Sequence, residues 1–118
     1  MVLVGVIPTL GGILILWVGA LAATDRLPRN GWAGIRTMTT LRDDETWYAA
    51  HRTGSRWLLA SGGLALATGL LVLVLRPDDT EVVTILLIGG LACGGCAIVA
   101  GITGQRAARR VLAARSDR

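Results

Sequence analysis

The chain has 118 residues, enough for one domain, with a formal net charge of +4 and a hydrophobic fraction of 53%. A soluble domain of this length could not bury so much apolar surface, so the composition excludes an ordinary soluble protein. The apolar residues lie in three uncharged blocks, each about the ~20 residues that cross a bilayer as a helix. We therefore predict an all-α membrane protein, a bundle of three transmembrane helices over residues 2–24, 57–75 and 82–104 within a single domain, 1–118.

Arginine placement predicts the orientation. All but one of the twelve basic residues lie between spans one and two or after span three, and Arg76 is the exception. With three spans those two segments share a side, which the positive-inside rule places in the cytosol. We expect a multi-pass protein of the cell membrane, with the N-terminus outside and the C-terminus cytosolic. The first span is expected to be retained rather than cleaved as a signal peptide.

The segment 25–56, between spans one and two, is predicted to be a cytosolic loop followed by a helix. Thr40-Leu41-Arg42-Asp43 matches a capping box, and the acidic residues that follow suit the positive end of a helix dipole. The helix would run to Arg52, with a bend at Gly54 before span two. Aromatic residues favour the membrane boundary, so we expect this amphipathic helix to lie on the cytosolic interface. Four of the five lie near it: Trp32, Trp47, Tyr48 and Trp57.

Small residues predict helix packing in spans two and three, because close backbone approach decides where helices meet in lipid. Span three holds six glycines, including the pair Gly90-x-x-x-Gly94, and we expect it to be the central helix or the one that forms an oligomer. Cys93 and Cys96 are interpreted as packing residues, with a redox role as the alternative. Between the two spans Pro77 ends one helix, and Asp79 or Thr80 is expected to cap the next.

The tail, 105–118, is predicted to continue span three as a basic helix. Arg106, Arg109 and Arg110 fall on one face beside the membrane, which suits anionic lipid headgroups of the inner leaflet. Nucleic acid is the weaker alternative, because no aromatic residues are interleaved for base stacking, and we expect none as a partner. A homo-oligomer or another membrane protein are further expected partners.

The pattern Asn30-x-x-x-Gly34-Ile35-Arg36-Thr37, followed by Trp47-x-x-x-His51-Arg52, resembles the signature of the SdpI family of small bacterial membrane proteins. In that family an N-x-x-x-G-[IF]-R-T segment follows one transmembrane helix and a W-x-x-x-[HN]-R segment leads into the next. The resemblance covers roughly residues 10–105. It implies a role like that of the eponymous member, which gives immunity to a secreted peptide toxin and holds a repressor at the membrane.

Two interpretations of this motif stay open. Its arginines could clamp an anionic group on a partner, since a guanidinium presents a planar fork of donors. The motif could instead only fasten the loop to its own helices. The candidate binding residues are Asn30, Gly34, Arg36, Thr37, Trp47, His51 and Arg52.

Enzyme, transport and metal functions are disfavoured. The chain has one histidine, no Walker-type loop and no HExxH sequence, and its spans contain no ionisable side chain for a proton or ion relay. We expect no cofactor and no metal. The prediction is a non-enzymatic SdpI-like membrane protein that acts in toxin immunity or signalling by binding a peptide, a lipid headgroup or a protein. The alternative is a small accessory subunit of a larger membrane complex.

Overall fold

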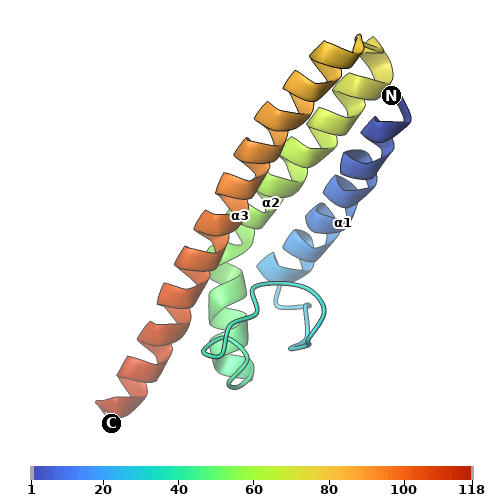
Figure 1. The fold of residues 1–118 in the computed structure, drawn as a ribbon. Coiled ribbons are helices and arrows are strands. Elements are labelled where there is room, and N and C mark those ends of the chain that lie inside the picture. The colour runs from blue at the N-terminus through green and yellow to red at the C-terminus, as the bar shows by residue number, and fades with distance from the viewer. Residues whose placement is uncertain (1, 118) are drawn as a thin grey trace.

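The computed structural model describes residues 2–117 and consists of three helices with a long loop after the first (Figure 1). A 3-10 turn, Val2–Gly5, leads into α1 (Val6–Ala23), which is followed by α2 (Asp44–Leu75) and α3 (Asp79–Ser116). Each helix contains an apolar stretch long enough to cross a membrane. The predicted all-helical, three-span fold is confirmed. Met1 and Arg118, the ends of the predicted domain, lie outside the described residues.

The three helices differ in length, and this difference makes room for the loop. The molecule is 60 Å long, about twice the roughly 30 Å of a bilayer core. α2 and α3 continue past their apolar spans at the end where α1 stops, and residues 24–43 fold against these two extensions (Figure 1). We call this end of the bundle the loop end. It carries every arginine of the described residues except Arg76, which lies in the turn between α2 and α3.

The structure does not show the predicted separate interfacial helix. Residues 44–56 are instead the first turns of α2, continuous with span two. Gly54 marks no bend. A Cβ atom on Gly54 would lie 2.9 Å from the Ala100 carbonyl oxygen of α3, so the glycine allows the two backbones to approach closely. Gly54, which the sequence suggested as a bend in the helix, is therefore a site of close packing between α2 and α3.

Both predicted helix caps are shifted. α2 begins after Asp43, whose carboxylate accepts from the Thr46 amide at 3.0 Å while the Thr46 hydroxyl accepts from the Asp43 amide at 3.2 Å. Asp78, not Asp79 or Thr80, caps α3 through the same exchange with Glu81. Each cap is a capping box with an acidic first residue. The prediction of a cap at Thr40 was wrong because that hydroxyl bonds within the loop.

α2, rather than α3, is the central helix. Within residues 2–117, α1 and α3 each pack on α2 and make no contact with one another (Figure 1). On the α3 side, the Ser61 hydroxyl donates to the Cys93 carbonyl at 3.0 Å, and Thr68 faces Gly89. Gly90 and Gly94 have open space beside them, so the GxxxG pair does not pack inside the monomer. The prediction that span three is the central helix was therefore wrong, while the alternative, that it forms an oligomer, stays a prediction.

Glycines on facing sides of α1 and α2 bring these helices into backbone contact. A Cβ atom on Gly12 would lie 2.4 Å from the Leu66 amide nitrogen and 2.8 Å from the Gly62 carbonyl oxygen. Towards the end of the bundle that lies away from the loop, a Cβ atom on Gly69 would lie 2.5 Å from the Thr9 amide nitrogen. Such contacts between backbones hold α1 in place, because lipid provides little hydrophobic drive for association.

Candidate functional site

Two fully buried side chains of α2, Trp47 and His51, form the base on which the loop is built. Both have no exposed surface, and their ring centroids are 4.1 Å apart. Trp47 packs with Ala22 of α1 and Leu27 of the loop, and its indole nitrogen donates to the Leu27 carbonyl at 2.8 Å. The start of the loop is thus fixed to α2 by an apolar cluster and one buried hydrogen bond.

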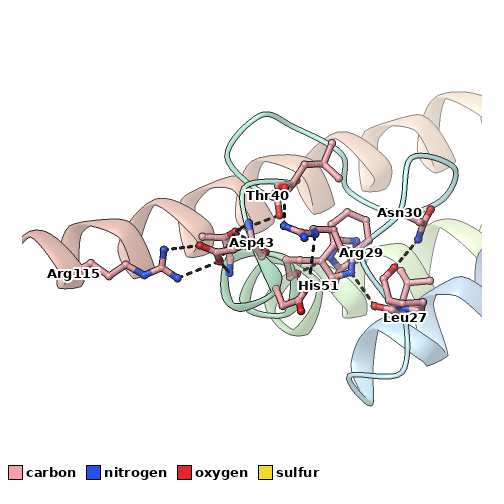
Figure 2. Close-up of polar contacts among 12 residues, drawn as sticks. Leu27, Arg29, Asn30, Thr40, Asp43, His51 and Arg115 are labelled. Carbon is pink, nitrogen blue, oxygen red and sulfur yellow. Dashed lines mark hydrogen bonds and ion pairs between the residues drawn. The ribbon is translucent and has the colours of Figure 1, made fainter.

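His51 fixes the middle of the loop. Its Nε2 atom accepts from the Ile35 amide at 2.8 Å, and its Nδ1 atom lies 2.7 Å from the Trp47 carbonyl oxygen (Figure 2). An acceptor at Nε2 requires the proton on Nδ1, which then donates to that carbonyl. The imidazole is therefore neutral and uses both nitrogens. It satisfies a buried loop amide that has no helix or strand partner.

Only glycine fits at position 34, because of its backbone conformation and because His51 lies directly against it. The Gly34 φ of 107° is a left-handed conformation that side chains rarely adopt. A Cβ atom there would also lie 2.4 Å from His51 Nε2. Immediately after it, the buried Ile35 side chain extends between Gly54 of α2 and Gly104 of α3. One glycine and the residue beside it therefore join the loop to both long helices.

Asn30 and Arg36 organise the exposed turn of the loop. The Asn30 carboxamide accepts from the amides of Trp32 and Ala33 at 2.7 and 2.8 Å, and its nitrogen donates to the Pro28 carbonyl at 2.7 Å. The Arg36 guanidinium donates to the Gly31 carbonyl and is otherwise exposed. Asn30 is used entirely within the turn, as such residues commonly are. Arg36 keeps donors that face solvent.

Thr37 and Thr40 close the loop on α3. The Thr40 hydroxyl accepts from the Thr37 amide at 2.8 Å and donates to the Ile35 carbonyl at 2.7 Å. The Thr37 hydroxyl donates to the Gln105 carboxamide oxygen, while the Gln105 nitrogen donates to the Thr39 hydroxyl at 2.9 Å. This network makes Gln105 of α3 a partner of two loop residues.

Arginine pairs neutralise the acidic start of α2. Arg115, near the end of α3, donates to Asp43 at 2.6 and 3.1 Å and to Glu45 at 2.6 Å (Figure 2). The Arg115 guanidinium holds the pKa of Asp43 well below its usual range. On the other side Arg29 lies 3.5 Å from Asp44. The acidic residues thus join three segments that are far apart in the sequence.

The sequence that makes these contacts matches a known protein family. The SdpI/YfhL protein family matches residues 26–103, which is more than half of the chain and includes residues 26–43 of the loop. The chain belongs to the SdpI/YfhL family. No curated protein and no solved structure matches it. The family region ends within span three, so the basic extension of α3 lies beyond it.

The structure brings the SdpI motif residues together, mostly through contacts within the chain. His51, Trp47 and Gly34 meet beneath the loop, Asn30 forms its turn, and Thr37 reaches α3. Arg52 is exposed, with its Nε atom 3.4 Å from Asp25 and 3.3 Å from the Tyr48 carbonyl. The buried members of the motif, Trp47 and His51, therefore fasten the loop, whereas Arg36 and Arg52 stay exposed. The side chains that the loop leaves exposed include Trp32, Arg36 and Met38, with 91% exposure for Trp32 and 95% for Met38.

The sequence did not single out the residues that connect the SdpI motif to α3. Gln105 and Arg115 were assigned to a basic tail, yet they bond to Thr37, Thr39, Asp43 and Glu45. The one signal for Gln105 is its position as the first polar side chain after span three. Within residues 2–117, no group of three or more His, Cys, Asp or Glu side chains could hold a metal ion.

The buried histidine predicts a pH dependence of stability. Burial lowers the pKa of His51 below its ordinary value of 6.5, against an opposing effect of the Trp47 carbonyl. The histidine lies before the predicted span 57–75, in the charged part of α2. As the pH falls below about 6.5 the unfolded chain binds a proton before the folded one does, so stability falls by at most about 1.4 kcal/mol per pH unit.

Thermal unfolding in detergent micelles between pH 5 and 8 measures this effect. The melting temperature is expected to be flat above pH 7 and to fall from pH 6.5 towards pH 5. His51→Gln, which keeps an acceptor but cannot titrate, is the control. An identical decline in this variant would show that the loss of stability does not come from His51.

Proposed function

We propose that this SdpI-family protein is a non-enzymatic membrane protein that acts in toxin immunity or signalling, through a binding surface on its cytosolic loop. The observation that carries the proposal is that the loop has two sets of side chains, one buried against the helices and one exposed. Buried motif side chains hold it on α2 and α3, while Trp32, Arg36 and Met38 remain exposed on it. A loop that only linked two helices would not need this internal framework.

The exposed residues indicate the chemistry of the partner. Trp32 and Met38 offer apolar contact area, and Arg36 retains donors for a carboxylate or a backbone carbonyl. Beside Trp32, Ala33 and Gly34 line an apolar pocket of about 230 Å³ with residues of α1 and α2. Such a surface suits a peptide or a protein segment with an apolar residue next to an acidic one.

Complementation of a deletion strain in the native host tests the role. Trp32→Ala and Arg36→Ala are expected to abolish protection or signalling, while immunoblotting shows normal amounts of the protein in the membrane. Trp17→Ala is the matched control, because Trp17 is also exposed but lies on α1, on the apolar span. Full complementation by both loop variants would rule out binding through this surface.

A partner bound at the loop is expected to follow the same pattern in affinity purification. Wild type and Trp17→Ala should retain it from native membranes, and Trp32→Ala and Arg36→Ala should lose it. Retention of the partner by all four proteins would place its binding surface elsewhere.

The outward face of α3 favours the second candidate, an accessory subunit of a larger membrane complex. Gly90, Gly94 and Gly95 have open space beside them, so a further helix could approach closely there. Purification in a mild detergent separates the candidates. A large partner in constant stoichiometry that Gly94→Leu releases would support the accessory role, whereas a lone homo-oligomer would count against it.

A further inference from the structure

A groove on the outer side of α3 combines apolar and basic walls. It has a volume of about 430 Å³, within the range of small-molecule sites, and is formed by one loop residue and one face of the helix. Its lining residues are Thr37, Ile98, Gly101, Ile102, Gln105, Arg106 and Arg109. The apolar residues belong to the predicted span, 82–104, and Arg106 and Arg109 follow its end within about one and a half turns. The groove therefore crosses the boundary between lipid tails and headgroups.

The two arginines of the groove have no anionic partner among residues 2–117. Arg29, Arg52 and Arg115 each have a carboxylate within 4 Å. No carboxylate or hydrogen-bond acceptor of residues 2–117 is paired with Arg106 or Arg109, and both side chains are exposed. They are three residues apart on one helical face, so both guanidinium groups can reach a single phosphate.

Gly101 gives the apolar half its depth. A Cβ atom built on it meets nothing within 4 Å, so the space beside the helix is open there. Ile98 and Ile102 are exposed on either side of it, one turn apart. This part of the groove offers an apolar channel that leads directly to the arginines.

We propose that this groove binds one anionic phospholipid, with its phosphate between Arg106 and Arg109 and an acyl chain along Ile98, Gly101 and Ile102. The charge of the unpaired arginines and the apolar wall below them match the two halves of such a lipid. Thr37 of the family motif lines the groove and bonds to Gln105, so a bound lipid would also contact the wall that holds the loop. The proposal does not depend on which partner the loop binds.

Native mass spectrometry of the purified full chain in detergent tests the proposal. Titration with dioleoylphosphatidylglycerol is expected to show one lipid held more tightly than further ones, and dioleoylphosphatidylcholine should bind at least ten-fold more weakly. Arg106→Gln and Arg109→Gln are each expected to weaken binding about five-fold, and about thirty-fold together. Arg110→Gln is the matched control, since it is exposed on the same turn but does not line the groove, and it should change the affinity less than two-fold.

A second pair of variants tests the acyl channel without changing charge. Gly101→Leu fills the channel and is expected to weaken binding of phosphatidylglycerol at least five-fold, while Gly90→Leu, also next to open space but three turns away, should leave it unchanged. Soluble glycerol phosphate at millimolar concentration should not displace the lipid. Equal losses in Arg109→Gln and Arg110→Gln would show diffuse attraction to charge and overturn the proposal.

Two further results would also overturn it. Unchanged binding by Gly101→Leu would show that no acyl chain lies in the groove, and displacement by glycerol phosphate would show a site for phosphate alone. The measurement uses purified protein and one lipid, so it succeeds or fails independently of complementation in cells. Circular dichroism checks folding of each variant, and the exposed arginine pair keeps the test valid if either glycine variant unfolds.

Discussion

Replacing Gly12 with alanine is expected to lower the free energy of unfolding by about 3 kcal/mol, although it adds one methyl group. The new Cβ atom would lie 2.4 Å from the Leu66 amide nitrogen and 2.8 Å from the Gly62 carbonyl oxygen. Both neighbours are backbone atoms of α2 and cannot rotate away, so α1 must move. Since α1 packs on no α-helix other than α2 within residues 2–117, its separation from α2 removes the support of Ala22 beneath the loop.

The neighbouring residue provides the control for this substitution. A Cβ atom on Gly11 meets nothing within 4 Å, so Gly11→Ala should leave stability unchanged or raise it by up to about 1 kcal/mol. Unfolding by sodium dodecyl sulfate in mixed micelles, followed by circular dichroism, measures both variants. Equal stability of Gly12→Ala and Gly11→Ala would show that α1 and α2 do not meet at this glycine.

Replacing His51 with alanine is expected to cost about 4 kcal/mol and to release the loop. The substitution leaves the Ile35 amide buried without an acceptor and opens a cavity against Trp47. The three spans should still insert, because their apolar segments are unchanged. We expect the amides of residues 28–43 to exchange hydrogen faster and trypsin to cleave after Arg29, Arg36 or Arg42.

His51→Gln separates loss of the hydrogen bond from loss of the side chain. The glutamine oxygen can accept from the Ile35 amide, so this variant should recover about half of the lost stability and most of the resistance to trypsin. The wild-type and variant proteins are compared at pH 7.5, where the histidine is neutral. Rapid cleavage of the glutamine variant, as fast as that of alanine, would mean that the hydrogen bond does not hold the loop.

The sequence was sufficient for the spans because membrane insertion depends on length and apolar composition. Residues 2–24, 57–75 and 82–104 were predicted close to where the apolar parts of α1, α2 and α3 lie. Packing order was not predictable in the same way. Glycine count favoured span three, but the direction in which each glycine faces decides packing, and Gly90 and Gly94 face away from α2.

The sequence predicted which residues belong to the site, but not which residues of α3 they contact. The family pattern named Gly34, Trp47 and His51, and these residues meet in the structure. The pairs Thr37 with Gln105 and Asp43 with Arg115 are separated by 68 and 72 residues, and one sequence carries no signal for such distances. The amphipathic helix was misjudged because aromatic residues mark the membrane boundary equally well in a helix that lies along it and in one that leaves it.

The link between Thr37 and Gln105 has a consequence for biogenesis. The loop leaves the ribosome well before the segment that holds it, since Gln105 follows Thr37 by 68 residues and Arg115 follows Asp43 by 72. Spans one and two can insert first, but the loop reaches its final form only when span three has inserted and its extension has emerged on the same side. A correctly folded loop therefore requires that all three spans are in place, and a partner that recognises the loop would ignore copies in which the third span has not yet been inserted.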